Sequence, residues 1–181
     1  MWKLCNKNIL NLIFFISVFS CLNTPDIAFA NLSIPRFISI KSNEVNLRSG
    51  PANHYPIRFI YKFKNYPLEI IAEFEHWRLV RDKDGDQGWV HQSLLSAARY
   101  VVIKNSNTTE KILKSQSLKN QAIIFRLPDE TSYPILRVET GAVAKIKKCL
   151  EKWCQIEFSK KRGWIQKSNI WGVYDYELLN N

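Results

Sequence analysis

The sequence GWVHQS at residues 88–93 recurs as GWIQKS at residues 163–168, 75 positions later in the chain. Three further pairs of landmarks precede these motifs in the same order: Leu47-Arg48 with Phe125-Arg126, Tyr55-Pro56-Ile57 with Tyr133-Pro134-Ile135, and Trp77 with Trp153. The interval falls from 78 to 75 positions, which shorter hairpin loops in the second copy would produce. Self-similarity of this kind predicts two related domains in tandem.

Each copy consists of short apolar segments separated by turn signals, without sustained helical periodicity. The strand-like segments are residues 37–40, 57–63, 68–74, 77–81 and 88–91, then 99–104, 122–126, 142–146, 153–158 and 163–166. Within the third of these, alternation would put four side chains on one face: Leu68, Ile70, Ala72 and Phe74. Five short strands in about 60 residues suit a small barrel. The sequence therefore predicts an all-β protein with two tandem barrels.

Several motifs resemble a known family. The first copy resembles the bacterial SH3-like domain at VNLRSGP (45–51), WRLVR (77–81) and GWV (88–90). More narrowly, four elements resemble small exported SH3-like proteins of Gram-negative bacteria: EIIAEF (69–74), GWVHQS (88–93), the Cys149 to Cys154 element and WGVY (171–174). The resemblance covers residues 37–175 and is looser in the second copy, where Leu127-Pro128-Asp129 replaces Ser49-Gly50-Pro51. It implies small barrels used for binding, in a family that often attaches to cell-wall peptides.

We accordingly expect a first SH3-like domain at residues 36–98 and a second, divergent one at 99–175. The second domain would contain a polar loop at 105–120, and a tail would follow at 176–181.

Residues 1–30 have the three-part pattern of a secretory signal peptide. Two lysines precede an apolar stretch at residues 9–22, and Ala28-Phe29-Ala30 matches a cleavage site. A membrane anchor is the alternative, although this stretch is short against the roughly 20 residues that span a bilayer. Lipid attachment at Cys21 is a second alternative. Cleavage near Ala30 would leave a mature chain without a transmembrane span, in the periplasm or outside the cell.

The chain of 181 residues has 26 Lys and Arg against 16 Asp and Glu, a formal net charge of +10. This charge predicts affinity for polyanions. Several basic residues cluster in the second copy: Lys145, Lys147, Lys148, Lys152, Lys160, Lys161 and Arg162. They indicate either a solvated face or a contact with anionic envelope polymers. Nucleic acid is a poor partner for an exported protein, despite the similar charge.

No motif for catalysis or for a cofactor occurs in the sequence. His54, His76 and His91 lack metal-ligand spacing, and the cysteines of the mature chain lie outside any nucleophile motif. Asp84 and Asp86 flank a hairpin turn, where Asp is common. The sequence therefore predicts neither an enzyme, a metal site nor a cofactor.

Cys149 and Cys154 bracket a predicted hairpin loop, and two cysteines in an exported protein predict one disulfide. The alternation of the strands argues against this pairing. Cys154 alternates with Ile156, whereas Cys149 alternates with Lys147, so the two would not share a face in a regular hairpin. A β-bulge, or a cysteine placed in the loop, would reconcile the bond with the pattern.

Four aromatic residues form the predicted binding surface: Tyr55, Trp77, Tyr133 and Trp153. Strand alternation turns each tryptophan away from the apolar face of its strand, so both are expected to be half-exposed. A half-exposed Trp offers a flat apolar surface and one N–H donor. We expect two similar grooves, one flanked by Tyr55 and the other by Tyr133. The alternative is that each Trp packs over its own hairpin or against the other copy.

These features predict a non-enzymatic binding module of the cell envelope, which recognises peptidoglycan peptides or an envelope protein. One alternative is a structural or assembly adaptor without a small ligand. Another is a fragment associated with a cell-wall hydrolase.

Overall fold

The computed structural model describes residues 33–104 and 120–180. The predicted signal peptide at residues 1–30 lies outside the described residues, as does all but the last residue of the predicted polar loop at 105–120. Residues Leu32–Asn181 form one compact unit. None of the helices in the described part of the chain is long and apolar enough to cross a membrane.

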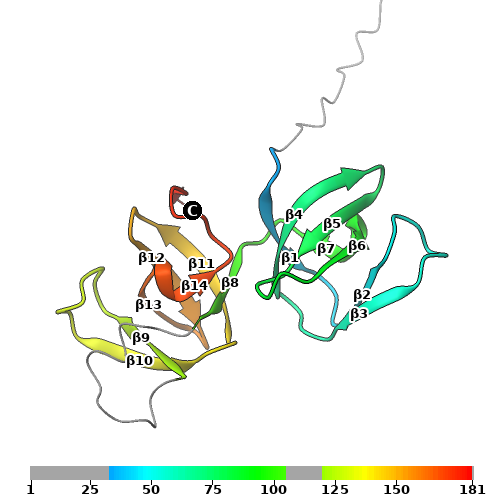
Figure 1. The fold of residues 1–181 in the computed structure, drawn as a ribbon. Coiled ribbons are helices and arrows are strands. Elements are labelled where there is room, and N and C mark those ends of the chain that lie inside the picture. The colour runs from blue at the N-terminus through cyan, green and yellow to red at the C-terminus, as the bar shows by residue number, and fades with distance from the viewer. Residues whose placement is uncertain (1–32, 105–119, 181) are drawn as a thin grey trace, which may run out of the picture. The chain divides into compact units, whose positions relative to one another are not determined.

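Seven antiparallel strands form the first sheet, in the spatial order β3-β2-β6-β5-β4-β1-β7 (Figure 1). Their bounds are β1 (Arg36–Ile40), β2 (Val45–Arg48), β3 (Ile57–Tyr61), β4 (Pro67–Phe74), β5 (Trp77–Arg81), β6 (Gln87–His91) and β7 (Leu95–Ser96). The sheet encloses a core of buried apolar side chains: Ile40, Val45, Leu47, Leu68, Ile70, Val80, Val90 and Leu95. We call this sheet and its core the first barrel.

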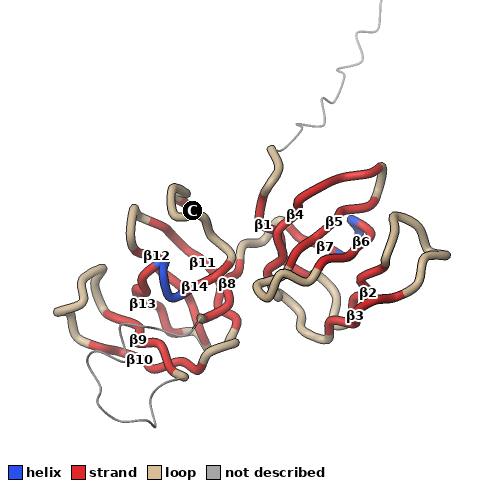
Figure 2. The backbone as a smooth tube through the Cα atoms, viewed as in Figure 1, coloured by secondary structure: helices blue, strands red, loops and turns tan. Residues whose placement is uncertain are grey.

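The second barrel repeats this plan in the order β10-β9-β13-β12-β11-β8-β14. Its strands are β8 (Tyr100–Ile103), β9 (Gln121–Phe125), β10 (Pro134–Glu139), β11 (Val143–Cys149), β12 (Trp153–Phe158), β13 (Lys161–Gln166) and β14 (Ile170–Trp171). A further short strand, β15 (Leu179–Asn180), pairs with β11. Single 3-10 turns, η1 (Gln92–Leu94) and η3 (Lys167–Asn169), precede β7 and β14 (Figure 2). The all-β prediction with two barrels is confirmed.

The glycine of each GW motif shows why the repeat was visible in the sequence. A Cβ atom on Gly88 would lie 2.7 Å from the Leu47 Cβ atom, and one on Gly163 would lie 2.4 Å from the Ile124 Cγ2 atom. Only glycine permits this close approach between strands without a shift of the neighbour. Leu47 and Ile124 are therefore equivalent positions, 77 residues apart. The sequence pairing of Leu47 with Phe125 is wrong by one residue, because Arg48 and Phe125 are the residues that pair with Trp89 and Trp164.

A β-bulge interrupts the same hairpin in both barrels. The β4–β5 register shifts between Ile70 and Ala72, and the β11–β12 register shifts between Ile146 and Lys148. The extra residue reverses the facing of everything beyond it. The prediction that Phe74 shares a face with Leu68 and Ile70 is therefore wrong: its side chain is 51% exposed.

Five strands were not expected from the sequence: β2, β7, β10, β14 and β15. Strands β2 and β10 lack a long apolar run, because only some of their side chains are turned to a core. The other three have two residues each and are defined by their pairing with strands that are distant in the sequence: β1, β8 and β11.

Candidate functional site

Two equivalent surface sites lie where the central hairpin of each barrel meets a 3-10 turn. Residues 75–77 and 91–93 form the first site, and residues 151–153 and 166–168 form the second. In each site the first residue of the turn donates its backbone N–H to the residue before the tryptophan: Gln92 to the His76 carbonyl at 2.8 Å and Lys167 to the Lys152 carbonyl at 2.9 Å. This hydrogen bond holds the 3-10 turn against the hairpin in both barrels. Trp77 and Trp153, which follow the two acceptor residues, therefore occupy equivalent positions beside the turn.

In the first site Trp77 is buried, with only 8% of its surface exposed. The prediction that it is half-exposed is wrong, although it does lie outside the core cluster of its barrel. Its ring meets the His91 ring edge to face, with 5.5 Å between centroids. Alternation therefore gave the correct side of the strand, but the neighbouring strand covers that side.

Polar side chains close the rest of the first site. The Gln92 amide lies 3.0 Å from His76 Nδ1, and its oxygen accepts a hydrogen bond from Arg78 at 2.7 Å. His91 Nδ1 lies 2.7 Å from the Ser93 hydroxyl. The histidines thus serve the local packing of the turn.

In the second site Trp153 is half-buried, as expected, and packs edge to face against Phe125 at 5.8 Å. Beside it the Gln166 amide donates a hydrogen bond to Glu130. A cavity of about 310 Å³ opens next to these residues, lined by Glu151, Lys152, Gln166, Lys167, Ser168 and Asp175. The cavity lining thus carries carboxyl, amide and hydroxyl groups, and Trp153 follows the lining residue Lys152 in the chain.

The two tyrosines are not equivalent to each other. Arg126 N donates to the Tyr133 carbonyl, as Ser49 N donates to the Pro56 carbonyl, so Tyr133 matches Pro56. Tyr133 is 74% exposed. Tyr55 is 38% exposed, and its ring stacks obliquely on His54 at 4.4 Å.

Neither tyrosine makes a ring contact with the tryptophan of its own barrel, within residues 33–104 and 120–180. In the second barrel, however, Trp153 packs on Phe125, and Phe125 pairs with Pro134, the neighbour of Tyr133. The binding role of Tyr55, Trp77, Tyr133 and Trp153 stays a prediction, and the two expected grooves differ in make-up.

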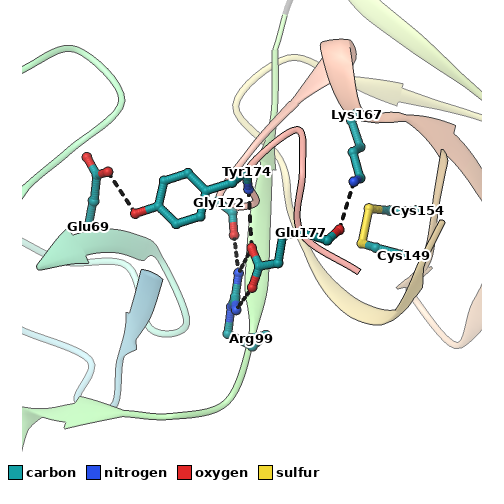
Figure 3. Close-up of polar contacts among 8 residues, drawn as sticks. All are labelled: Glu69, Arg99, Cys149, Cys154, Lys167, Gly172, Tyr174 and Glu177. Carbon is teal, nitrogen blue, oxygen red and sulfur yellow. Dashed lines mark hydrogen bonds and ion pairs between the residues drawn. A yellow bond between two sulfur atoms is a disulfide. The ribbon is translucent and has the colours of Figure 1, made fainter. Parts of the chain in front are cut away.

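The chain segment after β14 lies against the second site, held there by Lys167 (Figure 3). The side chain of Lys167 is buried, and its Nζ atom donates to the carbonyls of Asp175 at 2.8 Å and Glu177 at 2.7 Å. Burial lowers the pKa of Lys167, although the carboxylates of Asp175 and Glu177 oppose this shift. The ammonium group is thus committed to holding the C-terminal segment.

Arg99 anchors the same segment from the other side. Its Nη2 atom donates to Glu177 at 3.0 Å and to the Gly172 carbonyl at 2.9 Å. Burial by itself would raise the pKa of Glu177, but the hydrogen bonds and charge of Arg99 outweigh it and hold that pKa below its usual value. Glu177 also accepts the Tyr174 N–H at 3.2 Å, which closes the turn before β15.

Tyr174 carries this network to a strand of the first barrel. Its hydroxyl donates to Glu69 Oε1 at 2.9 Å, and Arg81 donates two hydrogen bonds to the other oxygen, Glu69 Oε2, at 2.6 and 3.0 Å. Burial, and then the Glu69 hydrogen bond, raise the pKa of the Tyr174 hydroxyl. The segment after Gly172 therefore has structural partners on both barrels.

The predicted disulfide between Cys149 and Cys154 is confirmed. The two cysteines are paired residues of β11 and β12, and the bulge before Lys148 supplies the change of face that the alternation required. The equivalent pair in the first barrel is Glu73 with Arg78, which form an ion pair at 3.1 Å. One barrel thus closes its hairpin with a covalent bond where the other uses opposite charges.

No group of three His, Cys, Asp or Glu side chains placed to hold a metal ion occurs among the described residues. The second site offers two carboxyl-bearing residues and several hydrogen-bonding groups around a small cavity, next to the half-buried Trp153.

A family model described as "Bacterial SH3 domain" matches residues 41–97 and again residues 119–172. These regions make up more than half of the chain, which therefore belongs to the bacterial SH3 domain family. Domains of this family are typically binding modules of the cell wall. The expected two-repeat organisation of that family is confirmed.

No curated protein matches the chain. Similar solved structures include NlpC2 from Trichomonas vaginalis, which is 14% identical at a TM-score of 0.31; the match covers 77% of this chain and 49% of the NlpC2 chain. NlpC1 from the same organism is 12% identical at a TM-score of 0.31, and the match covers 77% of this chain and 46% of the NlpC1 chain. An NlpC/P60 family protein from Bacillus cereus shares 10% identity at a TM-score of 0.32, covering 75% of this chain and 56% of that one. The chain spans about half the length of each. At these TM-scores the likeness carries no argument about function.

The sequence did not point to the residues that hold the C-terminal segment: Arg99, Lys167, Glu177 and Tyr174. One signal was available. The repeat places Lys167 where the first copy has Gln92, and a lysine at a buried turn position needs partners.

Proposed function

We propose that this protein is a non-enzymatic binding module of the bacterial cell envelope that recognises peptidoglycan stem peptides through the second site. The observation that carries the proposal is the half-buried Trp153 beside a polar cavity, in a chain of the bacterial SH3 domain family. The disulfide supports an exported location, since such bonds persist in oxidising compartments.

The lining of the cavity suits a wall peptide, which carries both amino and carboxyl groups. Glu151 and Asp175 provide carboxylates for an amino group, and Lys152 provides an ammonium group for a carboxylate. Trp153 provides an apolar face for the peptide backbone and side chains. The first site lacks an exposed tryptophan, so we assign recognition to the second site.

The test is retention of the purified mature protein on purified sacculi in low and high salt. Recognition through the cavity predicts retention that survives high salt and falls about tenfold in Trp153→Ala and in Glu151→Gln, each losing about 1–2 kcal/mol of contact. Glu139→Gln is the matched control, because it removes an exposed acid of the same barrel from β10.

If retention is lost in high salt and is equal in all variants, the binding is a non-specific electrostatic attraction between the basic protein and the anionic sacculus. Absence of retention in any salt would favour the adaptor without a small ligand. Either result would contradict the proposal.

A further inference from the structure

The outer edge of β4 in the first barrel has an occupied counterpart in the second. The bulge aligns β4 with β11, so that Ala72 and Glu73 correspond to Lys148 and Cys149. In the second barrel this edge is covered by β15, with Lys148 paired to Asn180 and Cys149 to Leu179. An edge of the same shape therefore accepts an extended peptide elsewhere in this chain.

In the first barrel nothing among the described residues pairs with this part of β4. Strand β1 pairs with β4 only as far as Ile70, and β5 covers the opposite edge. Residues 73 and 74 are exposed at the end of the strand, with half of the Phe74 side chain in solvent. Unpaired strand edges of this kind are sites for the addition of a further strand.

The arginine that anchors the C-terminal segment also has a counterpart. Arg99 lies opposite Ile146, whose N–H donates to the Arg99 carbonyl, and Arg36 pairs with Ile70 at the same position of the first barrel. Arg99 binds the carboxylate of Glu177, two residues before the residue that pairs with Cys149. Arg36 instead forms an ion pair with Glu73.

We propose that the β4 edge at residues 72–74 binds an extended acidic segment of a partner protein by strand addition, with its carboxylate on Arg36. The chemistry of the occupant follows from the segment seated on the equivalent edge: a carboxylate, one spacer residue, and then a backbone that pairs as a strand. The carboxylate displaces Glu73 from Arg36, and Glu73 keeps its second partner, Arg78. This site is independent of wall binding at the second site.

The probe is a synthetic capped peptide with the sequence of residues 173–180, titrated into the isotope-labelled mature protein and followed by NMR. We expect the largest amide shifts at residues 72–74. Two N-methylated peptides test the backbone pairing: one methylated at the positions of Leu178 and Asn180, the other at Glu177 and Leu179. Because alternate N–H groups of a strand point to opposite sides, one of the two should lose binding and the other keep it.

Charge variants test the anchor. Arg36→Gln should weaken binding about tenfold, as expected for a lost charge-assisted hydrogen bond. Glu73→Gln should tighten it about two- to fivefold, because it removes the charge of a carboxylate that competes for Arg36. Lys62→Gln, which removes the same charge from an exposed side chain beyond β3, should leave affinity unchanged.

The proposal fails if the shifts fall on β11 instead, which would mean that the probe displaces the chain's own C-terminal segment. It also fails if both N-methylated peptides behave alike, or if Glu73→Gln does not tighten binding. Dimerisation of the unliganded chain through residues 72–74 would make the occupant a second copy and would equally overturn it.

Discussion

Trp77 and Trp153 occupy the same position in two copies of one hairpin, but Trp77 is buried and Trp153 is partly exposed. Trp77 is 8% exposed and covered by His91, whereas Trp153 keeps a half-buried face beside the cavity. The first copy keeps the turn residues Ser49-Gly50-Pro51 of the family that it resembles, which would make Trp77 the clearer binding residue. Its burial reverses that expectation.

Replacement of each tryptophan by alanine separates the two roles. Truncation of a well-packed aromatic side chain removes about 3–5 kcal/mol of stability, so Trp77→Ala should lower the free energy of unfolding by that amount. Trp153→Ala should cost less, because part of its ring is already in water, and should weaken retention on sacculi beyond any loss of folded protein. Urea denaturation of both variants measures the difference. An equal loss of stability in both would contradict the contrast.

At the scale of elements, the hairpin β11–β12 and the segment that follows β14 stabilise each other. Cys149 is both a disulfide partner of Cys154 and the strand partner of Leu179. Leu179 in turn packs against the second core. The same hairpin position in the first barrel, Glu73 with Arg78, has only the weaker bond of a partly exposed ion pair.

Reduction of the disulfide should therefore lower the stability of the protein by about 2 kcal/mol, the chain-entropy value for so short a loop. The measurement is the urea midpoint with and without reductant. The double variant Cys149→Ser with Cys154→Ser is the control, since its midpoint should not respond to reductant. If the wild-type midpoint stayed unchanged on reduction, the bond would contribute nothing to stability.

The attachment of the C-terminal segment should depend on pH through Glu177. Its pKa is depressed in the folded protein, so the carboxylate stabilises the attached segment above the ordinary glutamate value of 4.5, and this stability is lost as pH falls through the lower folded value. The bonds of Lys167 go to backbone carbonyls, which do not titrate in this range. Acid should thus loosen the Arg99 anchor and spare the Lys167 one.

The methyl NMR signals of Leu179 report this change. They should move toward unpacked values as the pH falls below about 4.5, and Glu177→Gln should show the loosened signals already at neutral pH. Leu179 methyl signals that are the same in Glu177→Gln as in the wild-type protein at neutral pH would show that Arg99 and Glu177 do not govern attachment.

For the whole molecule, duplication explains what the sequence could and could not predict. The GW motifs were visible because Gly88 and Gly163 must admit a neighbouring strand, a requirement that tolerates no other residue. The β4–β5 bulge was not, because one extra residue at Ile71 leaves no compositional signal while it turns Phe74 outward. The β11–β12 bulge did have a signal, because Cys149 and Cys154 could share a face only with a bulge or with one of them in the loop. The burial of Trp77 under His91 and the pairing of β15 with β11 both depend on contacts with other strands. The alternation of residues within one strand carries no information about such contacts.

The location of the whole molecule supplies the last prediction. The disulfide requires an oxidising compartment to persist, and the pattern of residues 1–30 predicts export to one. Intact-mass spectrometry of protein recovered from the periplasm should find Asn31 as the first residue, with no alkylation of Cys149 or Cys154 before reduction. A retained Met1 or a lipid on Cys21 would contradict cleavage near Ala30. Two alkylated thiols would contradict the oxidising location, since the paired geometry of β11 and β12 would form the bond wherever oxidation is available.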